Sequence, residues 1–266
     1  MILGLHRASL RHGKAVQALR NVDLEIEAGE RVALIGPSGA GKSSLLNVLS
    51  TAIKPTEGEL RVLGEQPWNM GNRSRQRLRS RIGLVHQAPP IPGRQRVVTA
   101  VSAGRLAEWG LARGLLNLLH PLDAEGARKA LAELDLADKL FAQCGQLSGG
   151  QLQRVGIARV LYQSPELLLA DEPVSAMDPV LADHTLGVLC RNARERNVTL
   201  VASLHNVELA LAHFPRVIGL RDGQVMFDCA AADVAPERLR ALYANEHLVP
   251  APAAEADAMA VQIPRC

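Results

Sequence analysis

The chain has 266 residues, of which 47% are hydrophobic and only 3% are aromatic, so it can bury a sizeable core that must be mainly aliphatic. Its 30 basic and 27 acidic residues give a formal net charge of +3, which is too small by itself to indicate a nucleic-acid partner. The four cysteines are far apart and form no C-x-x-C pair, which disfavours a disulfide scaffold and a zinc site.

The first 35 residues predict short strands joined by turns. Residues 22–26 alternate apolar and polar side chains, as expected of a half-exposed strand, and residues 12–14 are typical of a hairpin turn. A turn at 28–30 then leads into the apolar run 31–35, which we interpret as a buried strand. A partly antiparallel sheet is therefore expected before the loop that follows.

This loop, residues 36–43, fits the pattern G-x-x-x-x-G-K-[ST] without a mismatch and stands between the buried strand and a helical segment at 44–49. Its three glycines let the backbone N–H groups point inward at a phosphate, and the following helix N-terminus adds positive charge. Lys42 supplies a cation for the β- and γ-phosphates, and the Ser43 hydroxyl is a Mg²⁺ ligand. We expect the nucleotide to be bound by Gly36, Pro37, Ser38, Gly39, Ala40, Gly41, Lys42, Ser43 and Ser44.

Arginine occupies every second position from Arg73 to Arg81, between strands expected at 59–64 and 82–87. One interpretation is a solvated helix face or loop. The other is an electrostatic patch that meets a phosphate-rich surface or an acidic partner loop. The sequence leaves both open.

The pattern is helical from residue 98 to about residue 165, with Asp123 as a helix N-cap. Strands then alternate with helical segments, and a hairpin turn follows the last of them; the strands are expected at 167–171, 198–204 and 216–220, and the turn at 221–224. This alternation predicts an α/β fold with a mostly parallel sheet and a helical subdomain inserted at about 88–165. Residues 246–266 are rich in alanine and proline, so we expect a weakly ordered tail.

Two further segments carry chemistry. Ser148 is a helix N-cap type, and Gly149 and Gly150 after it expose backbone N–H groups at a helix start, which suits a γ-phosphate. An apolar run ends in Asp171 and Glu172 at the carboxyl end of a strand, where ligands bind in open α/β sheets. Asp171 can hold Mg²⁺, directly or through water, and Glu172 can polarise the attacking water as a general base, worth roughly 10²–10⁴ in rate.

The segment 147–154, Leu-Ser-Gly-Gly-Gln-Leu-Gln-Arg, resembles the signature motif of ATP-binding cassette (ABC) ATPases, and the motifs follow that family's order over residues 1 to about 230. The resemblance implies the ABC ATPase fold over residues 1–245: a P-loop core with a mostly parallel sheet, an N-terminal antiparallel β subdomain and a helical insertion. It also implies ATP and Mg²⁺ as cofactors. The binding site for the ATP on one phosphate loop would be completed by a second copy of the chain, through its Ser148, Gly149, Gly150 and Gln151.

The same resemblance implies roles for individual residues. Gln87 matches the glutamine that touches Mg²⁺ and water and links the site to the helical insertion. A lone histidine after a strand is usually structural, but the chain order matches His205 to the residue that contacts the γ-phosphate and orients the water. Asp178 ends a segment similar to the family's D-loop and would contact the partner subunit. His12 is the best match to the aromatic residue, most often tyrosine, that stacks on adenine.

Four segments, at residues 103–106, 114–121, 203–210 and 216–228, look like those of phosphonate-importer ATP-binding subunits. The resemblance implies an ATP-hydrolysing importer subunit for phosphonates or a related phosphorus oxyanion. Its expected partners are a second copy, transmembrane permease subunits and, indirectly, a solute-binding protein, with no nucleic acid. The permease contact is expected at 88–90, where Ala-Pro-Pro replaces the family's more usual polar and aromatic residues.

No apolar segment approaches the ~20 residues needed to span a bilayer, and the N-terminus has no signal-peptide pattern. We therefore expect a peripheral position on the cytoplasmic face of the inner membrane, reached through a partner. A lipoprotein-release or cell-division ABC ATPase is the nearer alternative. A DNA-repair ABC ATPase is a more remote one, because the sequence lacks the long coiled-coil or zinc insertions of that class.

Overall fold

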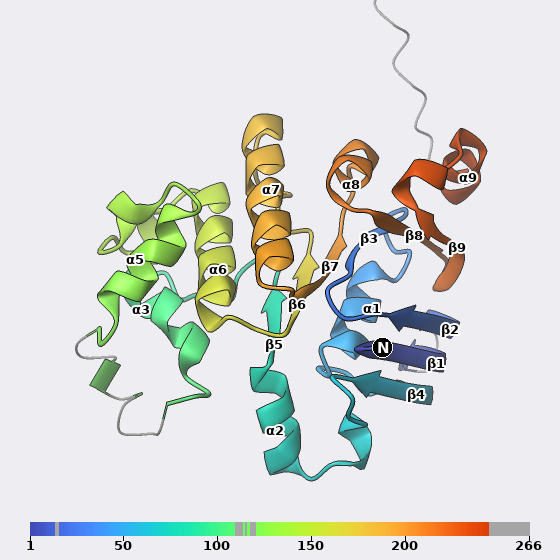
Figure 1. Cartoon of the computed structure of the whole chain (residues 1–266), viewed down its shortest axis with the longest axis horizontal. Helices are drawn as coiled ribbons and strands as arrows, with labels where there is room; N and C mark the ends of the chain where they lie inside the picture. The colour runs from blue at the N-terminus through green and yellow to red at the C-terminus, as the bar shows by residue number, and fades with distance from the viewer. Residues whose placement is uncertain (14–15, 110–113, 115, 118–120, 245–266) are drawn as a thin grey trace, which may run out of the picture.

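Two β-sheets, one antiparallel and one mostly parallel, position the rest of the chain (Figure 1). They belong to a computed structural model that describes residues 1–13, 16–109, 114, 116–117 and 121–244. The antiparallel sheet has the order β2-β1-β4, formed by β1 Leu3–His12, β2 Val16–Ile26 and β4 Glu57–Val62. The mostly parallel sheet has the order β5-β6-β7-β3-β8-β9, formed by β5 Ile82–Val85, β6 Leu167–Asp171, β7 Thr199–Ser203, β3 Arg31–Ile35, β8 Arg216–Arg221 and β9 Gln224–Ala230. Its last strand, β9, runs antiparallel to β8.

The parallel strands of this sheet are buried on both faces, which explains why they are nearly continuous apolar runs, whereas β9 at its edge has no fully buried residue. Successive residues of a strand point to opposite faces. In β3, Val32 and Leu34 pack in one apolar cluster with α1 (Lys42–Leu49) and the antiparallel sheet, whereas Ala33 and Ile35 pack in a second cluster with the helices of the other face. Aliphatic side chains fill both clusters almost entirely, as the composition predicts.

One of the remaining helices, at residues 72–80, packs in the cluster of α1 through Leu78, and the others lie on the second face of this sheet or at the two ends of the molecule (Figure 1). The remaining helices are α2 Asn72–Ser80, α3 Val97–Ser102, α5 Ala124–Ala132, α6 Gly149–Gln163, α7 Pro179–Glu195, α8 Val207–His213 and α9 Pro236–Leu242. Helices α3, α5 and α6 pack on one another beyond the β5 edge, in the region for which the sequence predicts a helical pattern. Asp123 caps α5 as predicted, because its Oδ1 accepts a hydrogen bond of 2.8 Å from the Gly126 N–H.

The strands at 31–35 and 167–171 have the predicted bounds, and other elements differ by a few residues. Helix α1 begins at Lys42, two residues earlier than expected, because Gly41 adopts a left-handed N-cap conformation immediately before it. Strand β4 begins at Glu57 rather than at residue 59, because Glu57 pairs with Ser9 of β1. The expected tail at 246–266 lies outside the described residues. Within the described part of the chain, none of the helices has the length and apolar character to traverse a bilayer.

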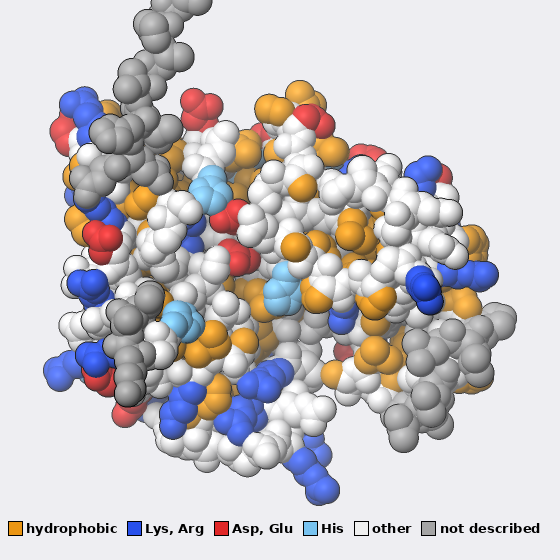
Figure 2. Space-filling model, turned by 180° about the vertical axis from the view of Figure 1, so that it is seen from behind, with side chains coloured by type: hydrophobic (Ala, Val, Ile, Leu, Met, Phe, Trp, Pro, Cys, Tyr) orange, Lys and Arg blue, Asp and Glu red, His pale blue; other side chains and the backbone are white. Residues whose placement is uncertain are grey.

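The five alternating arginines fall on or beside α2, and Figure 2 shows basic side chains along the lower edge of the molecule. They do not share one role. Arg79 donates to the Thr51 hydroxyl (3.0 Å) and to the Thr51 carbonyl (2.5 Å), and Arg81 makes two hydrogen bonds to the Glu166 carboxylate (2.5 and 2.8 Å). The run is therefore partly structural, because these two residues tie α2 to α1 and to the start of β6.

We predict that Arg81→Ala lowers the free energy of unfolding by about 0.5–1 kcal/mol at neutral pH, since a half-exposed pair is screened by solvent. The hydrogen bond from Arg81 lowers the pKa of the Glu166 carboxyl. This contribution is therefore complete above the ordinary glutamate pKa and is lost as the pH falls through the folded-state pKa. Chemical denaturation of both proteins at several pH values measures it. The exposed Arg73→Ala serves as the control, and an equal loss for Arg73→Ala, or a loss that persists in acid, contradicts the assignment.

Candidate functional site

The phosphate loop connects the end of β3 to α1, and two of its glycines are required by the backbone. Gly36 has φ +149°, and a Cβ at this position would lie 1.9 Å from the Leu220 carbonyl oxygen. Gly41 has φ +101°, and a Cβ there would lie 2.5 Å from the Ala18 carbonyl oxygen. Positive φ and this close approach leave room for glycine only. The neighbouring strands therefore fix the curl of the loop from both sides.

The β8–β9 hairpin holds the loop from outside. Gly223 lies in the turn that the sequence predicts at 221–224, and its N–H donates to the Ala40 carbonyl (3.0 Å) while its carbonyl accepts from the Arg20 N–H (2.8 Å). Inside the loop, the Lys42 ammonium group donates to the carbonyls of Gly36 (2.6 Å) and Pro37 (3.0 Å) and is almost fully buried. The arrangement thus holds a cation within a loop whose backbone curls around it, which is the geometry that a phosphate group requires.

Hard oxygen ligands gather between α1 and the ends of β6 and β7. The Ser43 hydroxyl donates to Asp171 Oδ1 (3.0 Å), and the Ser203 hydroxyl donates to the same oxygen (2.7 Å). Asp171 and Ser203 are partners in the register of β6 with β7, so adjacent strand ends bring them together. A hydroxyl and a carboxylate side by side at a phosphate loop fit Mg²⁺, which is usually held by one or two carboxylates together with the phosphates of the substrate.

Glu172 stands at the centre of the site. Its backbone has φ +46°, a strained conformation for a residue with a side chain, and its N–H donates to the Ser203 hydroxyl (2.9 Å). Its carboxylate is bonded on both oxygens: Oε1 to His205 Nε2 (2.5 Å) and Oε2 to Gln87 Nε2 (2.7 Å). The Glu172 side chain is only 13% exposed, whereas His205 is 50% exposed. Three residues that follow three adjacent strands therefore meet, as the sequence motifs predict.

Gln153 of α6 is part of this site, although the sequence analysis assigns it no role. Its Nε2 donates to the backbone carbonyls of Glu172 (2.8 Å) and Gln87 (3.2 Å), and its Oε1 accepts from the Ala176 N–H (3.1 Å). The side chain is 1% exposed. One buried amide thus joins the segments on which Gln87, Glu172 and Asp178 stand. The sequence does contain one sign of this role. Gln153 lies four residues before the buried Ile157, on the helix face where the helical period predicts an apolar residue, so a polar side chain there needs buried partners.

The other predicted residues lie apart from the Glu172 cluster. Ser148 and Gln151 cap α6 reciprocally: the Ser148 N–H donates to Gln151 Oε1 (3.0 Å), and the Gln151 N–H donates to Ser148 Oγ (3.3 Å). Gly149 and Gly150 form the first turn of that helix and leave its N-terminal N–H groups available. Asp178 caps α7 by accepting from the Leu181 N–H (3.0 Å). His12 is exposed at the end of β1. Ser148, Gly149, Gly150, Gln151 and Asp178 are the residues predicted to face a second copy, whereas His12 is predicted to contact adenine.

A phosphate loop, an acidic strand end and a glycine-rich helix cap on one chain define an ABC-type nucleotide-binding cassette. A family model described as ABC transporter matches residues 19–175, and the chain belongs to this family. Its sequence is 69% identical to the phosphonates import ATP-binding protein PhnC of Pseudomonas fluorescens (strain Pf0-1) over 266 residues, which is all of both chains. It is 61% identical to the protein named PhnC 1 of Pseudomonas aeruginosa over 267 residues, again the whole of both chains.

Solved structures agree with this assignment. A bacterial ABC transporter cassette solved as a dimer aligns with a TM-score of 0.77 and 29% identity, covering 86% of this chain and 98% of the other. A post-hydrolysis dimer of an ATP-binding cassette bound to ADP and Pi aligns with a TM-score of 0.75 and 28% identity over the same shares. The predicted fold class, a P-loop cassette with an antiparallel β subdomain and added helices, is confirmed.

We predict that Gln153→Leu lowers the rate of ATP hydrolysis by at least about tenfold, because losing the buried amide leaves the Gln87 carbonyl and the Ala176 N–H unpaired beside Glu172, at about 1–3 kcal/mol for each unsatisfied group. The Glu172 carbonyl keeps the hydrogen bond from the Ser175 N–H (3.2 Å). The control is Gln163→Leu on the same helix, where Gln163 Nε2 donates to the carbonyls of Ser80 and Ile82 (both 3.0 Å), away from the site. Turnover per folded molecule, with folding followed by circular dichroism, separates the two variants. Equal turnover losses for both variants would mean that Gln153 acts only on stability.

Proposed function

We propose that this chain is the ATP-hydrolysing subunit of an importer for phosphonates or a related phosphorus oxyanion. The observation that carries the proposal is the Glu172 carboxylate, held between His205 and Gln87 beside a phosphate loop. The proposed class of solute follows from the names of the Pseudomonas relatives, which this chain matches over their whole length. The cassette itself selects no solute in this proposal, since it supplies only the work of ATP binding and hydrolysis.

The nucleotide would lie on the loop from Gly36 to Ser44, with Lys42 at its β- and γ-phosphates. Ser43, Asp171 and the amide oxygen of Gln87 would hold Mg²⁺, which neutralises charge on the phosphates. The closeness of Ser43 Oγ and Asp171 Oδ1, 3.0 Å apart, supports this ligand set. His12 would stack on the adenine ring with a smaller aromatic surface than tyrosine offers.

Glu172 would take the proton of the attacking water, and His205 would contact the γ-phosphate and orient that water. Both oxygens of Glu172 are hydrogen-bonded to His205 and Gln87 in this conformation. Arrival of nucleotide therefore has to redirect one or both of these partners before the carboxylate can act as a base. Because Gln153 holds the backbone of both Glu172 and Gln87, such a change is limited to side-chain movements.

A second copy of the chain would complete each site. Ser148, Gly149, Gly150 and Gln151 present the N-terminus of a 15-residue helix, which suits the γ-phosphate on the partner's loop. Asp178 would contact the partner at the same boundary. Two head-to-tail copies related by a two-fold axis then enclose two ATP molecules. The dimeric state of the related bacterial cassettes supports this arrangement.

The permease would dock in a groove of about 400 Å³ that is lined by α2, β5 and the segment after it, residues 103–107 and α6. Pro89, Pro90 and Ile91 line one wall, and Pro89 packs on Gly156, where a Cβ would approach the proline ring to 2.8 Å. Burial lowers the pKa of His86 in this groove, so its ring is neutral at neutral pH. The groove begins one residue from Gln87, which gives a docked permease a short path to the catalytic cluster.

This partnership would place the chain on the cytoplasmic face of the inner membrane, with no nucleic-acid partner. A solute-binding protein would act through the permease. Helices α3, α5 and α6 would form the inserted helical subdomain, at about 88–165, that carries movement between the nucleotide and the permease within a cassette domain of residues 1–245.

The test is ATP hydrolysis in vesicles that contain the full chain, its permease and its solute-binding protein. We predict that a phosphonate stimulates hydrolysis by the wild-type complex. Glu172→Gln keeps ATP binding and dimer formation but loses roughly 10²–10⁴ in rate, because the amide cannot accept the proton of water. Glu166→Gln changes a carboxylate at the opposite end of β6, so it is the matched control and keeps its rate.

Near-normal turnover by Glu172→Gln would contradict the general-base assignment. Stimulation by a solute without phosphorus, with no response to phosphonates, would contradict the import proposal while leaving the ATPase assignment intact.

A further inference from the structure

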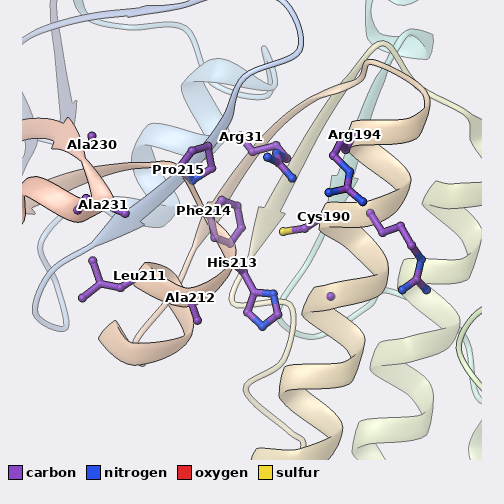
Figure 3. A pocket seen from close by; sticks show the side chains of 13 residues that line it. Arg31, Cys190, Arg194, Leu211, Ala212, His213, Phe214, Pro215, Ala230 and Ala231 are labelled. Carbon is purple, nitrogen blue, oxygen red and sulfur yellow. The ribbon is translucent and has the colours of Figure 1, made fainter.

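A cavity of about 780 Å³ opens at the end of β3 opposite to the phosphate loop (Figure 3). Arg31, at the cavity, is the first residue of β3, and the loop follows its last residue, Ile35. The other walls come from the C-terminal half of α7, the end of α8 and the end of β9. These two helices begin at Asp178 and directly after His205 and Asn206, so the cavity joins their far ends.

The charged residues that line this cavity are all basic. It is lined by Arg31, Gly187, Cys190, Arg191, Arg194, Leu211, Ala212, His213, Phe214, Pro215, Ala230, Ala231 and Ala232, with no carboxylate among them. Figure 3 shows Arg31 and Arg194 reaching in from β3 and α7, with Cys190 close to both. Three guanidinium groups around one hollow make a strongly positive potential in a chain whose whole net charge is +3.

Nothing in the described part of the chain compensates these cations. The guanidinium groups of Arg31, Arg191 and Arg194 make no hydrogen bond or ion pair with any described residue, although Arg31 is half-buried. The neighbouring Glu30 is bonded to Arg216 instead (2.7 Å). A half-buried cation is normally paired, so an unpaired one beside the exposed Arg191 and Arg194 favours the binding of an anion.

The remaining polar groups of the cavity do not supply that anion. Burial raises the pKa of the Cys190 thiol to about 11, so it is neutral at physiological pH. Asp183 lies outside the lining, and its Oδ1 is bonded to His213 Nε2 (2.8 Å). The positive charge of the three arginines is therefore available to a ligand.

We propose that this cavity binds a small dianion with a phosphoryl or phosphonyl group, at a site separate from the nucleotide site. The planar guanidinium fork matches two oxygens of a tetrahedral phosphorus centre, and arginines on different elements can engage it from several sides. Leu211, Phe214 and the alanines at residues 230–232 give the cavity an apolar wall that accepts a short organic substituent. A bound anion would tie β3, α7 and α8 together.

The test is isothermal titration of the full chain with methylphosphonate and with inorganic phosphate, at constant ionic strength set with chloride. We expect saturable binding that is weakened at least about tenfold in the double variant Arg191→Ala/Arg194→Ala, because two charge-assisted contacts are lost. The exposed pair Arg73→Ala/Arg77→Ala removes the same charge elsewhere and should leave binding unchanged. Lys42→Ala should also leave it unchanged, since that residue belongs to the phosphate loop.

Circular dichroism and thermal melting confirm that each variant is folded. Equal affinity for the two ligands would identify the phosphorus group alone as the recognised part, and tighter binding of methylphosphonate would add the apolar wall; both results support the site. Absence of saturable binding overturns the proposal. So does binding that Lys42→Ala removes and the pocket variant retains, because the anion would then lie on the phosphate loop.

Discussion

Parallel strands end at the same edge of their sheet, and this constraint assembles the site around Glu172. The strand order β5-β6-β7-β3 places Gln87, Glu172, His205 and the phosphate loop side by side, although about 170 residues separate the loop from His205. Each residue follows the strand that positions it, so the sheet converts four distant segments into one cluster. Gln153 connects α6 to this cluster, because its buried amide donates hydrogen bonds to the backbone carbonyls of both Glu172 and Gln87.

Much of this arrangement is readable in the sequence because it is encoded locally. Buried strands appear as apolar runs, and the glycines of the phosphate loop are placed where positive φ and close backbone approach demand them. Strand ends are marked by the polar residues that follow, so Asp171 and Glu172 stand out without knowledge of the fold, whereas His205 is singled out only by the resemblance to the family. The capping residues Asp123 and Ser148 are found for the same reason, since a cap bonds to residues only two or three positions away.

Features that depend on which distant segments meet are not readable in this way. Ser203 binds Asp171 only because β7 pairs with β6, and Arg81 binds Glu166 only because β5 lies beside β6. The arginine run therefore has one sequence pattern but several environments. The cavity of Arg31, Arg191 and Arg194 is a stronger case, because its members lie 160 residues apart and carry no motif. Only the packing of α7 on β7, the strand next to β3 in the sheet, brings their charges together.

The central claim is that each ATP site uses the phosphate loop of one copy and the helix cap of the other. Mixed dimers of two tagged chains test it by counting trapped ATP. In a dimer of one Lys42→Ala chain and one Ser148→Phe chain, both changes fall in the same composite site and the other site stays intact. This dimer should therefore trap about one ATP, half as many as the wild-type dimer. A dimer of wild type with the double variant Lys42→Ala/Ser148→Phe should trap none, because each composite site then contains one change. The reverse result, trapping only in the second dimer, would mean that each site forms within a single chain and would contradict the account.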